Sequence, residues 1–373
     1  MRKAFFAAAA TTATLAAVAA TLPAQAGTVH HAQKGIAVKY KIVASGLHGP
    51  RHIAFAANGD MYVAEAGKGG HGACIAGGEG PSCFGWTGSV TRVRHGKQHR
   101  VLTHLASLSD QGNGESPIGP SGLAVVGKHT LVLSMGLGGN PKERKKVPAR
   151  AQKQLGHVLS FNLHSKKATS AGDLAAYEKK ANPVNDPNSD PTGLVRMGKA
   201  GWLITDSGGN DLVSLKNGKV KTVAKFQSRK SSELPPGSTY ESVPTDVVKG
   251  PDGAFYVSEL TGFPFIPGAA RIWRVVPGHK PKVWASGLTN VTSMAFDGKK
   301  LYAVQIADLG LLDAGGPEGS LRQVFPDSSG KASKPIATAL FAPYGVAIHR
   351  GAAYVSLGAV TDTDGIVIKV PLS

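Results

Sequence analysis

A four-strand unit recurs six times along this chain, and this repeat constrains the fold more than any other sequence feature. Each copy begins at a proline or polar residue and continues as a short apolar strand, a glycine turn and further strands. The copies begin at Pro50, Pro120, Pro191, Pro244, Asn290 and Pro343. Asn-Gly and Asp-Gly pairs lie where hairpin turns are expected. The 48 glycines and 23 prolines likewise favour short strands over long helices.

The two ends of the chain together complete the repeat. The sixth copy stops after its third strand, whereas residues 42–47 match the fourth strand of copy four, residues 283–288, with Ala-Ser-Gly-Leu identical. We therefore predict an all-β fold: a single six-bladed β-propeller domain over residues 38–373, closed by an N-terminal strand that completes the last blade. The alternative is a β-sandwich with coincidental repeats.

The first residues have the pattern of a targeting segment. Arg2 and Lys3 precede an uncharged apolar run, residues 4–22, which ends in Ala24-Gln25-Ala26. This predicts a bacterial secretory signal peptide over residues 1–26, cleaved near Ala26, and a short tail over residues 27–37. A membrane anchor is the alternative. No later stretch is apolar enough to span a bilayer, so we expect a secreted, extracellular protein whose mature chain has no transmembrane segment. We also expect it to be a monomer.

The chain has two cysteines, Cys74 and Cys83, in one glycine-rich stretch. Two cysteines exclude a disulfide-dense scaffold and a four-thiolate zinc site. In an oxidising compartment the pair is expected to form a disulfide. Two free thiols are the alternative.

The long connections of a propeller with this repeat all fall on one face, which we call the long-loop face; they are residues 66–88, 106–119, 137–156, 175–190, 227–243 and 306–319. Long loops on a rigid scaffold are common places for binding sites. The second strands end there in Glu65, Asp206, Glu259 and Gln305. The first strands start there with Arg51, His52, Asp246 and Tyr344. We expect these side chains to point toward the axis and take them as metal or ligand candidates.

Several motifs resemble the ScyD/ScyE family of secreted propellers. They are Met-Tyr-Val-Ala-Glu-Ala-Gly at 61–67, Leu-Ala-Ala-Tyr-Glu at 174–178, Asp-Ser-Gly-Gly-Asn-Asp-Leu at 206–212 and Ser-Glu-Leu-Thr-Gly-Phe-Pro-Phe at 258–265. The match covers residues 38–372. The resemblance implies a secreted propeller and carries no settled activity.

The acidic candidates suggest one cofactor. Oxygen ligands from Glu65, Asp206, Asp246 and Glu259 suit Ca²⁺, which accepts six to eight ligands in loose geometry. Alternatively these carboxylates accept hydrogen bonds from backbone N–H groups, or pair with Arg51, and tie the blades together. His52 is the candidate general base. The sequence contains neither Gly-x-Ser-x-Gly nor His-Glu-x-x-His.

The charge balance is basic, with a formal net charge of +18. A basic loop provides the anion-binding candidates Lys142, Arg144, Lys145, Lys146 and Arg150. An anionic cell-wall polymer is the partner that this charge favours outside a cell. Aromatic residues make up only 6% of the chain and none lies in this loop, which argues against nucleic acid. A solvated loop without a partner is the alternative.

Two classes of function remain open. The first is a secreted propeller that binds a small molecule or a protein on its long-loop face, without catalysis. The second is a Ca²⁺-dependent propeller enzyme, either a lactonase-type hydrolase or a quinone-dependent sugar dehydrogenase. The enzyme needs a cation-bound water or a histidine base at the axis. The sequence contains no recognisable base and nucleophile pair and therefore favours binding.

Overall fold

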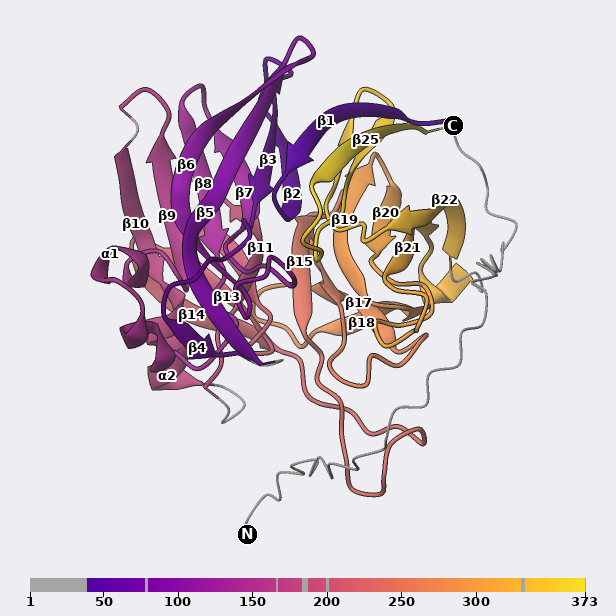
Figure 1. Cartoon of the computed structure of the whole chain (residues 1–373). Helices are drawn as coiled ribbons and strands as arrows, with labels where there is room; N and C mark the ends of the chain where they lie inside the picture. The colour runs from indigo at the N-terminus through magenta and orange to yellow at the C-terminus, as the bar shows by residue number, and fades with distance from the viewer. Residues whose placement is uncertain are drawn as a thin grey trace, which may run out of the picture. The chain divides into compact units, whose positions relative to one another are not determined.

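The computed structural model describes residues 39–77, 80–165, 167–182, 187–198, 201–329 and 333–372 (Figure 1). The expected signal peptide and tail, residues 1–37, lie outside the described residues. In the described part of the chain, no helix is long and apolar enough to cross a membrane. Almost all of the regular structure is antiparallel β-sheet.

The strands form six sheets, each built around four antiparallel strands, which we call blades 1 to 6. From the axis outward, blade 1 contains β2 (Pro50–Phe55), β3 (Met61–Glu65), β5 (Pro81–Arg94) and β6 (Lys97–Asp110). Blade 2 contains β7 (Pro120–Val126), β8 (Thr130–Met135), β9 (His157–Asn162) and β10 (Lys167–Asp173). Blade 3 contains β11 (Pro191–Met197), β12 (Gly201–Asp206), β13 (Asp211–Lys216) and β14 (Lys219–Lys225).

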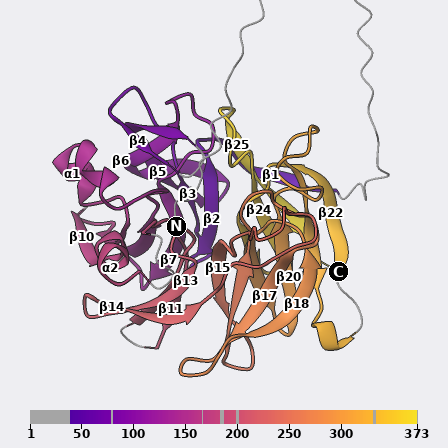
Figure 2. The same cartoon turned by 90° about the horizontal axis from the view of Figure 1, so that it is seen from below.

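The second half of the chain repeats this order. Blade 4 contains β15 (Pro244–Lys249), β16 (Phe255–Glu259), β17 (Ala270–Val275) and β18 (Lys282–Leu288). Blade 5 contains β19 (Val291–Asp297), β20 (Lys300–Gln305), β21 (Glu318–Val324) and β22 (Ser333–Phe341). Blade 6 contains β23 (Val346–His349), β24 (Ala352–Leu357), β25 (Gly365–Pro371) and β1 (Lys41–Leu47). Each inner strand contacts the inner strand of the next blade, and β23 contacts β2, so the sheets close into a ring (Figure 2).

Blade 6 confirms the predicted closure. The N-terminal strand β1 pairs antiparallel with the C-terminal strand β25, with Lys41 opposite Lys369 and Leu47 opposite Gly365. Leu47 is fully buried, in a core cluster that also contains Val367. Strands from the two ends of the described chain therefore pair within one sheet, and β1 covers the edge that β25 would otherwise expose.

Close packing at the axis explains why small residues recur near the start of the inner strands. A Cβ atom added to Gly193 would lie 2.5 Å from Cα of Asp246 in the next blade. At Gly345 it would lie 2.3 Å from the carbonyl oxygen of Arg51. Any side chain at these two positions would therefore push neighbouring inner strands apart.

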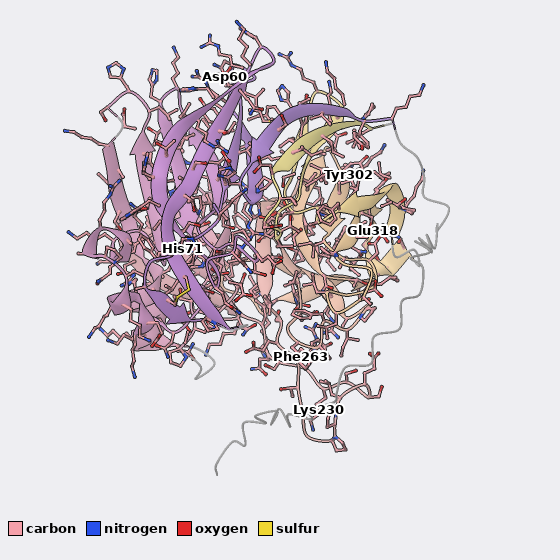
Figure 3. All side chains as sticks on the ribbon, viewed as in Figure 1. Asp60, His71, Lys230, Phe263, Tyr302 and Glu318 are labelled. Atoms are coloured by element: carbon pink, nitrogen blue, oxygen red, sulfur yellow. A yellow bond between two sulfur atoms is a disulfide. The ribbon has the colours of Figure 1, made fainter. Side chains whose placement is uncertain are left out.

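The long-loop face carries the 3-10 helix η1 (Glu143–Lys146), α1 (Ala149–Gln152) and α2 (Leu174–Ala181), whereas a second 3-10 helix, η2 (Asp327–Ser329), lies between β21 and β22. Blade 1 differs from the expected pattern, because β5 begins within the predicted loop and pairs there with an extra strand, β4 (Cys74–Ala76). Cys74 and Cys83 face each other across this pair and form the predicted disulfide, which lies near His71 in Figure 3.

Candidate functional site

The inner strands bring a cluster of polar side chains together on the axis, which we call the axial cluster: Arg51, His52, Asp190, Asp246 and Tyr344. Arg51 and His52 begin β2, Asp246 begins β15, and Tyr344 and Asp190 precede β23 and β11. Burial is deep, since Arg51 and His52 are each 7% exposed, Tyr344 is 8% and Asp246 is 4%. Polar groups that are buried this deeply require hydrogen-bond partners.

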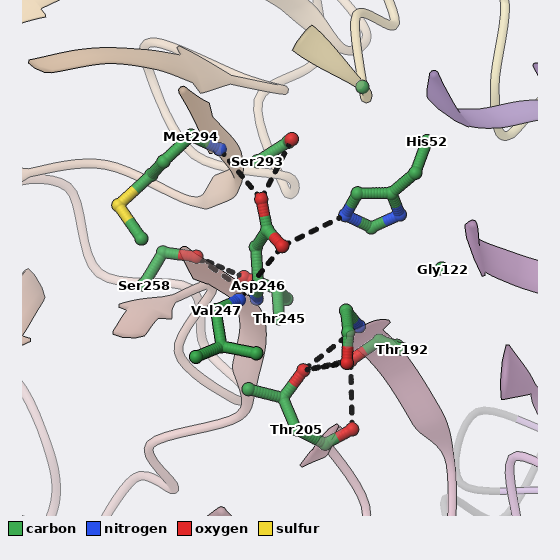
Figure 4. Close-up of polar contacts among 12 residues, drawn as sticks. His52, Gly122, Thr192, Thr205, Thr245, Asp246, Val247, Ser258, Ser293 and Met294 are labelled. Carbon is green, nitrogen blue, oxygen red and sulfur yellow. Dashed lines mark hydrogen bonds and ion pairs between the residues drawn. The ribbon is translucent and has the colours of Figure 1, made fainter. Parts of the chain in front are cut away.

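His52 and Asp246 meet across the axis from opposite blades (Figure 4). Nε2 of His52 lies 3.4 Å from Oδ1 of Asp246. The carboxylate is held in place, because Oδ2 accepts hydrogen bonds from the Ser293 hydroxyl at 2.9 Å and from the backbone N–H of Met294 at 2.8 Å. Among the described residues, neither ring nitrogen of His52 has a hydrogen-bond partner, although both are buried. The imidazole can therefore still donate to or accept from a bound molecule.

Arg51 and Tyr344 lie beside this pair. The guanidinium carbon of Arg51 is 4.3 Å from the ring centroid of Tyr344, and the same ring meets His52 edge-on at a centroid distance of 5.6 Å. Nη2 of Arg51 donates to the carbonyl oxygen of Pro117, which fixes the cation. Burial raises the pKa of the Tyr344 phenol; the Arg51 cation opposes the rise and Asp190 adds to it. The phenol therefore stays protonated and remains a hydrogen-bond donor.

Asp190 adds a second carboxyl group to the cluster, close to Arg51. Burial, together with the negative charge of Asp206, raises the pKa of Asp190 to about 7. The Arg51 cation and the backbone N–H groups of Leu137 and Gly138 oppose that rise. The carboxyl group thus changes charge near neutral pH, a property that is common at functional sites.

The raised pKa of Asp190 predicts a pH-dependent stability. Between about pH 4 and pH 7 the folded chain keeps a proton on Asp190 that the unfolded chain releases, so ionisation lowers stability as the pH rises. At about 1.4 kcal/mol per pKa unit, the cost is up to about 4 kcal/mol above pH 7. Asp190→Asn should remove this part of the slope, as measured by urea unfolding across that range. The exposed Asp297→Asn is the control, and an unchanged slope in Asp190→Asn would contradict the assignment.

The predicted residues at the ends of the second strands do not join the axial cluster; each binds local partners instead. Glu65 accepts hydrogen bonds from Arg100 Nη2 at 2.8 Å and from the backbone N–H of His48 at 2.8 Å. Asp206 accepts from the Ser189 hydroxyl at 2.8 Å and from the backbone N–H of Asp190 at 2.6 Å.

Glu259 and Gln305 repeat this arrangement in blades 4 and 5. Glu259 forms a bidentate ion pair with Arg229, with both N–O distances at 2.8 Å. Gln305 Oε1 accepts from the backbone N–H of Thr289 at 3.0 Å. In each of these blades, the side chain that ends the second strand bonds to the segment that precedes the inner strand of the blade.

These contacts bear on the predicted Ca²⁺ site. Glu65 and Glu259 are already paired with arginines, and Asp206 is hydrogen-bonded by hydroxyl and backbone donors. Across the described residues, no group of three or more His, Cys, Asp or Glu side chains could hold a metal ion. Glu65, Asp206, Asp246 and Glu259 therefore do not form a shared oxygen cage, because each has its own hydrogen-bond partners.

Two of the five anion-binding candidates are already paired with acidic side chains. Arg144 forms a two-bond ion pair with Asp173, each bond 2.8 Å long, and Lys146 pairs with Glu143 at 2.6 Å. Lys142 and Lys145 belong to the same turn, around η1. Arg150 stacks on the ring of Trp86 at 4.8 Å. Of the five candidates, Arg150 alone lines a groove between blades 1 and 2.

Sequence reasoning missed three charged residues that matter here. Asp190 was hidden because it precedes Pro191 rather than lying in the strand itself. Arg100 and Arg229 were missed because they come from an outer strand and a loop, where the repeat predicts no partner for an inner carboxylate. The signal for Asp190 was positional, since it is the only acidic residue directly before a repeat start.

Comparisons with known proteins agree with this fold. No family model matches the chain, and no curated protein matches it. Among solved structures, a calcium-binding regucalcin from Agrobacterium tumefaciens gives a TM-score of 0.55 at 10% identity, over 90% of this chain and 94% of that chain. A putative oxidoreductase (glucose dehydrogenase) from Thermus thermophilus gives 0.53 at 16% identity, over 89% of this chain and 99% of that chain.

A third structure, a Bacteroides thetaiotaomicron protein of unknown function, gives a TM-score of 0.53 at 12% identity, over 91% of this chain and 73% of that chain. Identities this low show the fold alone. Together with the closed ring, they define the chain as a six-bladed β-propeller protein.

Proposed function

We propose that this chain is an exported propeller that binds a small, oxygen-rich ligand at the axial cluster. One observation carries the proposal: both ring nitrogens of the buried His52 lack a hydrogen-bond partner within the described part of the chain. A buried polar group without a partner is costly unless a ligand or water satisfies it. Export is supported by the sequence pattern of residues 1–26 and by the Cys74–Cys83 disulfide, which suits an oxidising compartment.

The side chains of the axial cluster indicate which chemical groups a ligand should carry. His52 and the protonated Tyr344 can donate a hydrogen bond, and Asp190 can donate or accept according to pH. Arg51 supplies a fixed positive charge close by. This set suits hydroxyl, lactone or carboxylate oxygens. The low exposure of the cluster restricts the ligand to a small molecule.

Thermal unfolding with a panel of simple sugars, sugar acids and lactones tests the proposal. A ligand at a hundredfold excess over Kd stabilises the folded state by about 2.7 kcal/mol. We expect at least one compound to raise the Tm of the wild type and not of His52→Phe, which keeps an aromatic ring but removes the nitrogens. His129→Phe, an exposed turn histidine, is the control and should respond like the wild type. No stabilising compound, or an equal response in His52→Phe, would contradict the proposal.

Lactone hydrolysis is the second candidate function, and the His52–Asp246 contact of 3.4 Å favours it. A carboxylate beside an imidazole orients the ring, so that it can take a proton from water. The same panel separates the two functions. Acid release from a lactone by the wild type, lost in both His52→Phe and Asp246→Asn, would indicate catalysis. Stabilisation without acid release would leave binding alone.

A further inference from the structure

A groove of about 830 Å³ opens between blades 1 and 2, far from the axial cluster. Its walls come from the outer strands β6 and β10, from β9 and from α1. The volume falls within the range of about 300–1,000 Å³ that is typical of small-molecule sites. No part of the axial cluster lines it, so its function is independent of the function proposed above.

Short side chains on β10 explain why the groove is open. Ala168 lies opposite Phe161 and Ser170 opposite Leu159 in the β9–β10 pair. The corresponding outer positions of blade 3 are Val220, opposite Leu215, and Thr222, opposite Val213. There Val220 packs on the core between blades 2 and 3, and Tyr177 bonds to Thr222 at 2.9 Å. The outer part of the interface is thus filled in blade 3 and left open in blade 2.

The floor of the groove is apolar. Leu102 and Leu105 of blade 1 and Leu159 and Phe161 of blade 2 line it, and all four belong to the core cluster between these blades. Burying a hydrocarbon chain against such a floor yields about 25 cal/mol per Å² of apolar surface. The floor can therefore contact an extended apolar ligand, while Gln154, Thr169 and Ser170 add polar groups to the lining.

Both ends of the groove carry basic side chains. Arg92 and His99 form a cross-strand pair at one end, and Arg150 and Lys153 lie at the other end, where Arg150 reaches the carbonyl oxygen of His104. At about 3.4 Å per residue, His99 and His104 are roughly 17 Å apart along β6. No carboxylate lines the groove in the described part of the chain.

Some of the basic side chains that line the groove already have an acidic partner, which identifies those that are left for a ligand. Arg100 pairs with Glu65 at 2.8 Å, and His157 lies 3.2 Å from Asp173. Arg92, Arg150 and Lys153, which also line the groove, form no ion pair with any described residue. An apolar floor with unpaired cations at its ends is complementary to an anion that carries a hydrocarbon chain.

We propose that this groove binds a single-chain anionic amphiphile, a long-chain carboxylate, with the chain along the floor and the carboxylate at the Arg150 and Lys153 end. The carboxylate would accept hydrogen bonds from these two side chains, which are charge-assisted and short. Neither the ring closure nor the axial cluster depends on this occupant.

A fluorescence titration of the full chain with dansyl-labelled undecanoate tests the proposal. We expect saturable binding, and displacement by dodecanoate at concentrations at least tenfold lower than by dodecanol or propionate. Dodecanol tests the contribution of the charge, and propionate tests that of the chain. Equal displacement by dodecanol would mean that the carboxylate does not contribute, and equal displacement by propionate would mean that the hydrocarbon chain does not contribute. Either result, or the absence of saturable binding, would overturn the proposal.

Two variants locate the ligand. Lys153→Glu reverses an exposed charge at the groove and should weaken binding at least tenfold, whereas Lys128→Glu, an exposed turn lysine of the same blade, should not. Ala168→Trp should fill the space beside Phe161 and block the probe while the Tm stays near that of the wild type. Wild-type binding by either Lys153→Glu or Ala168→Trp, or an equal loss in Lys128→Glu, would overturn the assignment to this groove.

Discussion

Replacing Glu259 by alanine is expected to lower the free energy of unfolding by about 3–5 kcal/mol, because it breaks a buried ion pair and leaves the other charge unpaired. Arg229 contributes two hydrogen bonds of 2.8 Å to this carboxylate, and Trp273 donates its indole N–H at 2.6 Å. The Glu259 side chain is fully buried and that of Arg229 is 14% exposed. Urea unfolding of the variant and the wild type measures the effect.

Blade 4 also provides a matched control. Asp252 and Arg274 form an ion pair of the same length, 2.8 Å, but each side chain is 37% exposed. Exposed pairs contribute no more than about 1 kcal/mol, so Asp252→Ala should cost far less than Glu259→Ala. Equal losses in the two variants would mean that burial does not set the value of the Glu259 pair.

A chain that begins at His48, and so lacks β1, should fail to give a stable soluble monomer. Removal of β1 leaves the backbone groups of β25 unpaired and uncovers the apolar face on which Leu47 and Ala44 pack. An open edge beside an exposed apolar face promotes association between chains. Size-exclusion chromatography and thermal melting followed by circular dichroism measure both effects.

A chain that begins at Lys39 is the control for this truncation. It keeps every strand of blade 6, and we expect it to be monomeric with the Tm of a chain that begins at Gly27. If the chain that begins at His48 melts like this control, β1 does not stabilise the ring.

The repeat was sufficient to predict the ring and its closure, because both depend on local patterns. Blade hairpins follow from glycine turns, as at Asn217 and Gly218, whose φ angles of 50° and 74° are those of a tight hairpin turn. The closure followed from one identical tetrapeptide at residues 44–47 and 285–288. Such signals involve neighbouring residues, so they can be recognised without knowing the tertiary structure.

The site was harder to predict, because its contacts join residues from separate blades. Asp206 and Glu259 were placed correctly at the ends of their strands, yet their partners could not be identified. Arg229 reaches Glu259 from a loop, and His52 meets Asp246 only because blades 1 and 4 face each other across the ring. The partners of a buried carboxylate depend on side-chain rotamers and on the paths of the loops, and the sequence repeat predicts neither.

The pairing of β1 with β25 also orders the assembly of the molecule in time. Lys41 emerges from the ribosome before almost all of the described chain, whereas its partner Lys369 belongs to the last described strand, β25. The first strand must therefore wait, unpaired, while five blades are completed, and the loop that it finally closes is nearly as long as the chain. Contacts of such high sequence separation form slowly, so the step that seals the ring is expected to be the last and to depend on an intact β25.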